Sequence, residues 1–395
     1  MLSCCTRHRL PTAIATRQFR LRRMGGDSEA QRLLAVKQRD VGYLNPGDRD
    51  YDQKLTQLWG GPGIRWYHEA VRTFPASYRG SDKVALVTGS CGGIGFYVAK
   101  LLAHCGYTVI IPARPGLESE AQGAMSAISE AVPEAKIVIP PSTLDLRSFA
   151  SVRVFSKSVR EAHPCIDVLC LNAGRGGGSS DPREDTGDGH EAIMQVNTTS
   201  QWLLACELLP SLQASPKARI VCQSSGARFN VRPEDVHDLD GTGPAAFNAW
   251  AQYSLSKACM CLFARALNDR LVAHDVDNVI ALVSEPGLTA TGVNIQHDLV
   301  KSLGLTKRGL NNTNEMHDQA GHHAADGALP MTLASLVGER NEFFCTNGNR
   351  CGSLSEAAFK APLRGRGEPM LWDPAFCDKF WDSANLLTGA RWSFA

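Results

Sequence analysis

The sequence contains no apolar run that approaches the roughly 18 residues needed to span a bilayer, so we expect no transmembrane segment. Net charge is also nearly absent, because 41 Lys and Arg residues balance 40 Asp and Glu residues to a formal +1. A chain this close to neutral has no general attraction for nucleic acid or for anionic membranes. No internal repeat is evident. These absences leave a small molecule as the expected partner, and they are compatible with a homo-oligomer.

The cysteines follow no repeating framework. There are 13 of them, an odd number, and several lie inside apolar stretches where free thiols behave as small hydrophobic side chains. We therefore expect free thiols and a reducing compartment. No spacing of Cys and His residues fits a zinc site, so no metal centre is expected.

Acidic residues are missing from the first 26 positions, which carry six arginines. This composition is typical of an organelle transit peptide and predicts a mitochondrial or plastid protein. A disordered basic tail, or a start at Met24 in a cytoplasmic protein, is the alternative. We divide the chain into a transit peptide (1–26), an N-terminal extension (27–80) without an assigned function, and one domain (81–395).

From Lys83 onward, short apolar runs alternate with helical patterns. Strands are expected at 84–87, 107–113, 136–144, 166–171, 219–223 and 278–283. Strands separated by helices of about ten or more residues form a parallel sheet covered on both faces. The expected architecture is a doubly wound α/β fold, the Rossmann fold, with about seven strands.

The first strand ends in a glycine-rich turn, Thr88-Gly89-Ser90-Cys91-Gly92-Gly93-Ile94-Gly95. Gly89 permits a tight turn, Gly93 permits close approach of the backbone to a pyrophosphate, and Gly95 permits helix and strand to pack closely. The turn lies between an apolar strand and a helix, the context in which such glycines bind a dinucleotide.

The spacing of this turn resembles that of the short-chain dehydrogenase/reductase family, whose other motifs follow in order. They are Asp145-Leu146, Asn172-Ala173-Gly174, Asn197, Ser224-Ser225, Tyr253-x-x-x-Lys257 and Pro286-Gly287 with Thr291. The resemblance implies cofactor contacts by Gly89, Ser90, Gly93, Ile94, Gly95, Arg114, Asp145, Leu146, Asn172, Ala173, Gly174, Tyr253, Lys257, Pro286, Gly287 and Thr291. Finer features, such as Thr186-x-Asp188-Gly189-x-Glu191, are similar to the retinol-dehydrogenase-like and protochlorophyllide-reductase-like branch.

Tyr253 and Lys257 are four residues apart in a helical pattern, so both project from one face. The Lys257 ammonium would lower the pKa of the Tyr253 phenol, which would act as general acid and base during hydride transfer. The resemblance implies that Ser225 holds the substrate oxygen and that Asn197 carries a water to Lys257. Two alternatives stay open: Ser224 as the active serine, and a purely structural Asn197.

The end of the second strand, about 20 residues past the turn, decides between the two nicotinamide dinucleotides. An acidic residue there would favour NAD, but the chain has Arg114, which could pair with the 2′-phosphate of NADP. We expect NADP(H) to be preferred over NAD(H), unless Arg114 merely lies on a solvated loop.

The sequence thus predicts an NADP(H)-dependent oxidoreductase that interconverts an alcohol and a carbonyl on a lipophilic small molecule. The alternative is a non-catalytic nucleotide-binding subunit of an organellar complex. The long segment 226–251, rich in glycine and weak in periodicity, predicts a mobile lid over the substrate.

Overall fold

The computed structural model describes residues 64, 66–178, 181–243, 246–287, 289, 323–345, 349–353, 370–371 and 373–394. Its centre is one sheet in the order β3-β2-β1-β4-β5-β6-β7-β8. Strands β1 to β7 are parallel, and β8 is antiparallel to β7. The strands are β1 (Val84–Val87), β2 (Thr108–Ile110), β3 (Lys136–Val138), β4 (Val168–Leu171), β5 (Ala218–Gln223), β6 (Val279–Glu285), β7 (Glu342–Cys345) and β8 (Asn349–Ser353).

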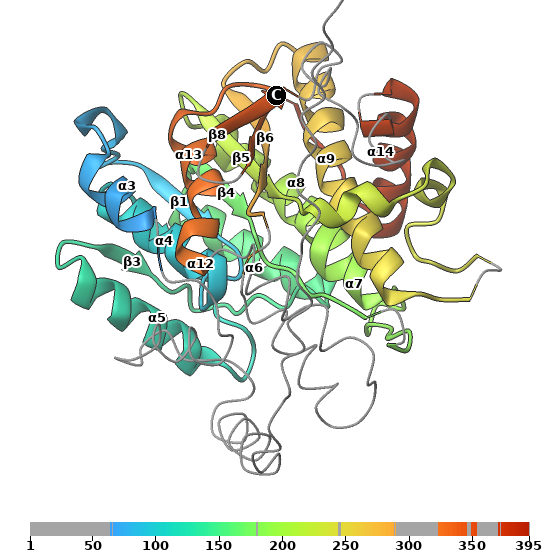
Figure 1. Ribbon diagram of the computed structural model, residues 1–395, viewed down its shortest axis with the longest axis horizontal. Helices are drawn as coiled ribbons and strands as arrows, with labels where there is room; N and C mark the ends of the chain where they lie inside the picture. The colour runs from blue at the N-terminus through green and yellow to red at the C-terminus, as the bar shows by residue number, and fades with distance from the viewer. Residues whose placement is uncertain are drawn as a thin grey trace, which may run out of the picture.

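Helices connect the strands and cover both faces of the sheet (Figure 1). Those before β6 are α3 (Tyr67–Thr73), α4 (Gly93–His104), α5 (Glu118–Ala131), α6 (Phe149–Ala162), α7 (Ala192–Met194), α8 (Ser200–Gln213) and α9 (Ala249–Ala273). Those after it are α12 (Ala324–Gly327), α13 (Leu329–Val337) and α14 (Pro374–Thr388). Tighter turns are η1 (Ala76–Tyr78), η3 (Gly226–Asn230) and η4 (Pro233–His237), and η2 (Gln195–Thr199) is a π-helical turn.

Alternate residues of each strand face opposite sides of the sheet, as the period of two requires. In β1, Ala85 and Val87 join a hydrophobic cluster with α4, α5 and α13, whereas Leu86 joins a second cluster with α6, α8, α9 and α14. The doubly wound fold expected from the sequence is confirmed. Strands β2 and β3 are shorter than predicted, and β8 adds an antiparallel edge.

Helix α14 seals the second cluster with aromatic side chains. Trp202 of α8 is fully buried and makes edge contacts with the rings of Phe263, Phe380, Trp381 and Trp392, at 4.6–5.3 Å between centroids. Its indole nitrogen donates to Asn385 Oδ1 at 2.9 Å, across 183 positions of sequence. The chain after β8 therefore completes the core under α8 and α9.

The described part of the N-terminal extension packs on the opposite face. Asp326 of α12 accepts hydrogen bonds from the backbone nitrogens of Trp66 and Tyr67, both at 2.9 Å. The Tyr67 ring then packs edge-on against Tyr97 of α4, 5.4 Å away. This part of the extension is thus an arm that covers α4 and α12.

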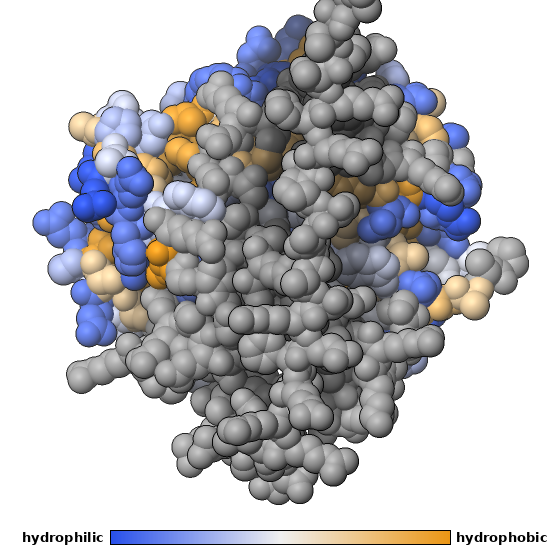
Figure 2. Space-filling model, in the orientation of Figure 1, coloured by the Kyte–Doolittle hydropathy of each residue, from blue (hydrophilic) through white to orange (hydrophobic). Residues whose placement is uncertain are grey.

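The surface of Figure 2 is largely hydrophilic on its coloured flanks, with small hydrophobic groups between. No helix in the described ranges combines the length and the apolar character that crossing a membrane requires. In the same ranges, no three His, Cys, Asp or Glu residues gather as metal ligands. Nine described cysteines are free, but the half-buried Cys345 is disulfide-bonded, which corrects the expectation of free thiols throughout.

Candidate active site

The turn between β1 and α4 takes its shape from three glycines. Gly89 has φ +67° and Gly93 has φ +52°, conformations that residues with a Cβ rarely adopt. A Cβ on Gly95 would lie 2.3 Å from the Gly89 carbonyl oxygen, so only glycine fits there. Half-buried Ile94 lies between the last two glycines. The turn thereby presents the N-terminus of the twelve-residue helix α4, where backbone N–H groups stabilise an anion.

Ser90 provides a test of whether this turn fits a pyrophosphate. Its hydroxyl is buried and has no hydrogen-bond partner within the described ranges. Buried polar groups without a partner are uncommon and call for an explanation. A phosphate oxygen held at the start of α4 would supply the missing partner. The residues at the turn therefore fit the pyrophosphate of a dinucleotide.

A hydrogen-bond network joins the ends of β1 and β4. The Thr88 hydroxyl accepts from the backbone nitrogens of Asn172 and Ala173, both at 2.9 Å. The Asn172 amide donates to the Thr88 carbonyl at 2.8 Å, and Gln201 Nε2 donates to the Ala173 carbonyl at 2.6 Å. Gln201 also contacts Thr88 Oγ1 at 2.9 Å. The sequence reading missed Gln201, because nothing in its helical surroundings signals a role at the sheet edge.

The predicted adenine-side residues lie in the segments that follow β2 and β3 rather than at the strand ends, because β3 already stops at Val138. Asp145 Oδ1 accepts from the backbone nitrogen of Arg147 at 2.8 Å, and the buried Leu146 accepts from Ser200 through its carbonyl. Arg114, after β2, is ion-paired with Glu120 of α5 at 2.6 Å. The sequence reading found no carboxylate before Glu118 and did not anticipate that the first turn of α5 would bring Glu120 to Arg114.

Helix α9 brings Tyr253 and Lys257 to the carboxyl edge of the sheet. The Asn248 side chain caps it by accepting from the backbone nitrogen of Ala251 at 2.9 Å. Lys257 Nζ donates to the Gln223 carbonyl at 3.2 Å and lies 5.8 Å from the centre of the Tyr253 ring. A Cβ on Gly174 would lie only 3.2 Å from Lys257 Nζ, so the end of β4 approaches the same ammonium. Sequence motifs from β4, β5 and α9 thus meet here.

The two serines after β5 have different surroundings. The Ser224 hydroxyl is buried and donates to the Lys257 carbonyl at 2.7 Å, which anchors α9. The half-buried Ser225 is the serine whose side chain makes a hydrogen bond with Tyr253. The geometry therefore favours Ser225 over the Ser224 alternative.

Burial dominates the electrostatics of the pair on α9. Burial raises the pKa of Tyr253, the hydrogen bond with Ser225 lowers it, and the Glu285 carboxylate raises it again. Burial also lowers the pKa of Lys257 to about 8. The sequence reading expected a lowered pKa for Tyr253. The direction is opposite because removal from water disfavours the phenolate more than the groups present stabilise it.

Asn197 lies in the π-helical turn η2, an irregularity that often marks functional sites. Its Oδ1 accepts from the backbone nitrogen of Arg175 at 2.7 Å. Its Nδ2 donates to the Arg175 carbonyl and to Ser256 Oγ, both at 2.9 Å. These bonds hold the loop after β4 on α9. Such a role agrees with the alternative that Asn197 is purely structural. The water relay through Asn197 stays a prediction.

Pro286 and Gly287 follow β6, and Gly287 has φ +71°. Thr291 lies outside the described residues. Arg228 and Glu285 form a buried ion pair between η3 and the end of β6. The sequence did not predict a role for either residue. They are 57 positions apart, and no motif signals their pairing.

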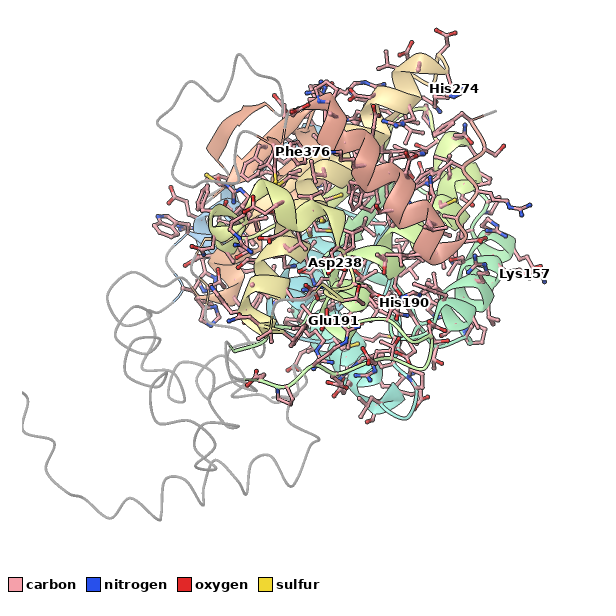
Figure 3. All side chains as sticks on the ribbon, turned by 90° about the vertical axis from the view of Figure 1, so that its right-hand side faces the viewer. Lys157, His190, Glu191, Asp238, His274 and Phe376 are labelled. Atoms are coloured by element: carbon pink, nitrogen blue, oxygen red, sulfur yellow. The ribbon has the colours of Figure 1, made fainter. Side chains whose placement is uncertain are left out.

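The segment expected to be a mobile lid packs against the core in large part. Val231, Val236 and Leu239 are buried in the cluster under α9. Further along, Asp240 bonds His190 Nδ1 at 2.9 Å and the backbone nitrogen of Glu191 at 3.0 Å, and Figure 3 shows these two residues beside Asp238. Buried apolar side chains and these bonds attach residues 226–241 to the core. Ordering of the segment over a bound substrate stays a prediction.

Comparison with known proteins agrees with this geometry. The family model described as "short chain dehydrogenase" matches residues 83–237. Polyprenol dehydrogenase from Mus musculus is 33% identical over 213 residues, which cover 53% of this chain and 60% of that protein. The WW domain-containing oxidoreductase from Danio rerio is 34% identical over 201 residues, covering 50% and 47%. The matched region thus spans about half the length of these relatives.

Two solved structures share the fold. An uncharacterised protein from Mycobacterium paratuberculosis aligns with a TM-score of 0.59 at 23% identity, covering 82% of this chain and 98% of that one. L-sorbose reductase from Gluconobacter frateurii aligns with a TM-score of 0.53 at 19% identity, covering 69% and 98%. Taken with the ordered motifs and the sheet order, the sequence matches show that this chain is similar to the short-chain dehydrogenase/reductase family, with the family model matching residues 83–237.

Proposed function

We propose that this protein is an NADP(H)-dependent oxidoreductase that interconverts an alcohol and a carbonyl on a lipophilic small molecule. The observation that carries the proposal is the meeting of Ser225, Tyr253 and Lys257 at one edge of the sheet. The glycine turn that fits a dinucleotide opens at the same edge, because the carboxyl ends of parallel strands lie together. When bound, the nicotinamide supplies or accepts the hydride.

The side chains would divide the remaining work. Ser225 would hold the substrate oxygen within reach of Tyr253, whose hydroxyl donates a proton during reduction and accepts one during oxidation. Lys257, with its pKa of about 8, is mostly charged at neutral pH and would favour the phenolate when the proton leaves. Exclusion of water by the surrounding core would strengthen these interactions.

Two observations support a lipophilic substrate. Trp250 is 44% exposed although it is a large apolar side chain, and its ring centre lies 5.6 Å from that of Tyr253. Mouse polyprenol dehydrogenase, a relative, is named for a lipophilic alcohol. An exposed aromatic ring beside a reacting centre is suited to contact an apolar chain.

The assay for this function is NADPH oxidation with a series of aldehydes and ketones of increasing chain length, with a polar sugar as control. We expect kcat/KM to rise with chain length. Cofactor binding without turnover of any compound would instead favour the alternative of a non-catalytic nucleotide-binding subunit.

The preference for NADP(H) rests on Arg114. Its guanidinium has several donors, so it can keep Glu120 and still bond a 2′-phosphate. Such charge-assisted bonds contribute roughly 1.5–3 kcal/mol each. We therefore expect about a ten- to hundredfold preference for NADPH in kcat/KM.

Arg114→Asp should reverse this preference, since a carboxylate repels the phosphate and accepts from ribose hydroxyls. Glu120→Gln should increase it, because the competing carboxylate is removed. The measurement is kcat/KM with both cofactors for each variant. A wild-type preference for NADH, or a ratio that Arg114→Asp leaves unchanged, would refute the assignment.

We also propose import into a mitochondrion or plastid, supported by the six arginines and the missing acids of residues 1–26. We expect processing near residues 24–30 in the organelle. N-terminal sequencing of the native protein tests this, with a variant that has the six arginines replaced by Gln as control. Native protein that begins at Met1 would contradict the proposal.

A further inference from the structure

A buried ion pair lies immediately behind the candidate active site. Arg228 of η3 pairs with Glu285, the last residue of β6, and their side chains are only 5% and 15% exposed. An ion pair removed from water requires compensating contacts to be stable. Arg228 has them, because its guanidinium lies 4.2 Å from the ring centre of Phe229 and 4.8 Å from that of Phe343.

Arg228 also holds the residue that carries the serine hydroxyl. Its Nη1 donates to the Ser225 carbonyl at 3.0 Å, and its backbone nitrogen donates to the same oxygen at 3.1 Å. Ser225 is the cap of η3, with its Oγ accepting from Ala227. Two donors from one residue therefore fix the turn on which Ser225 lies.

Glu285 lies close to the reacting groups on the other side. A Cβ on Gly226, next to Ser225, would come within 3.4 Å of Glu285 Oε1. The same carboxylate raises the pKa of Tyr253. A carboxylate in a poorly solvated place repels a phenolate strongly unless a cation screens it.

The charged groups around Tyr253 come from several elements in the described ranges. Lys257 is on the same helix, and Glu285 and Arg228 come from β6 and η3. From the loop after β4, Arg175 is already paired with Glu184 at 2.6 Å. Arg228 is thus the cation that pairs with Glu285, the carboxylate among the described residues that acts on Tyr253.

We propose that Arg228 is a positioning residue, which holds the turn of Ser225 on the end of β6 and screens Tyr253 from the Glu285 carboxylate. This role rests on the proposed function of Tyr253 as acid and base. Arg228 and Glu285 lie outside the motifs that resemble the family. Arg228 acts through Ser225 and Tyr253 rather than on the substrate.

The test is the pH profile of alcohol oxidation, which requires deprotonated Tyr253. Arg228→Met keeps the length of the side chain but leaves Glu285 unscreened, so the acid limb should move up by about one pH unit. Glu285→Gln leaves the cation without its partner, so the limb should move down. The double variant should return close to the wild-type profile.

Arg270→Met is the matched control. Arg270 also pairs with a carboxylate, Asp378 at 2.6 Å, and lies 4.6 Å from an aromatic ring centre, that of Trp381. This pair joins α9 to α14 away from the site, so its loss should leave the limb where it is.

The screening role would be refuted if Arg228→Met lowered kcat but left the acid limb of the pH profile at the wild-type pH. It would also be refuted if the acid limb moved in the same direction in Arg228→Met and in Glu285→Gln. If Arg228→Met does not fold, Glu285→Gln alone tests the screening role. An acid limb that stays at the wild-type pH in that variant would refute the role. Failure of the proposed function is distinguishable, because Tyr253→Phe would then retain activity and the limb would not depend on Tyr253.

Discussion

Replacing Tyr253 by Phe is expected to lower kcat by about 10²–10⁴-fold, the contribution typical of a general acid or base. The substitution removes the hydroxyl and keeps the ring, so the contacts of the ring with Trp250 and Lys257 are preserved. Affinity for the cofactor should stay within a few-fold of the wild-type value. Steady-state kinetics and a fluorescence titration with NADPH measure the two quantities.

Tyr97→Phe is the matched control for this prediction. Tyr97 is only 1% exposed, and its hydroxyl has no hydrogen-bond partner within the described part of the chain. Its loss should change neither kcat nor cofactor affinity. If Tyr253→Phe keeps more than about a tenth of the wild-type kcat, Tyr253 is not the acid and base.

Gly95→Ala is expected to have the largest effect on the fold and the cofactor site together. The new methyl carbon would lie 2.3 Å from Gly89 O and 2.5 Å from Asn172 Nδ2, so the turn or the end of β4 must shift. Overpacking in a protein core typically lowers the free energy of unfolding by about 1–3 kcal/mol, occasionally more, and we expect a similar cost here. Because the displaced groups also shape the glycine-rich turn between β1 and α4, cofactor affinity should fall at least about tenfold.

Gly92→Ala tests the same turn without the clash. No atom lies within 4 Å of the position of its Cβ, and its φ of −170° is extended backbone that any residue adopts. Both stability and affinity should stay near wild type. Thermal unfolding with and without NADPH measures the two variants, and equal behaviour of both would contradict the packing role of Gly95.

The sequence predicts the strands that form the centre of the sheet well, because their apolar runs are buried on both faces and lack polar interruptions. Val84–Val87 and Val168–Leu171 coincide closely with the expected ranges. Residues after Ile110 and Val138 were also expected to be strand but lie outside the regular ladder of β2 and β3, although single backbone hydrogen bonds such as that from Ile111 to Val138 continue beyond it. Apolar character alone cannot show where a neighbouring strand stops offering hydrogen bonds.

The arrangement of the candidate site was predictable where spacing along one element fixes geometry, as for Tyr253 and Lys257 on α9. It was not predictable where partners come from distant elements. The choice between Ser224 and Ser225 depends on which hydroxyl the α9 backbone engages. The direction of the Tyr253 pKa depends on burial and on Glu285, neither of which a motif encodes.

The aromatic seal by α14 has a consequence for the order in which the protein is built. During synthesis the chain emerges from its N-terminus, so α8 and α9 are complete before α14 exists. Until then the α8 face around Trp202 lacks its α14 partners, because Phe380 and Trp381 lie far along the chain. A nascent intermediate with an open aromatic surface is a substrate for chaperones, and this domain should reach its native core only late in translation or after it.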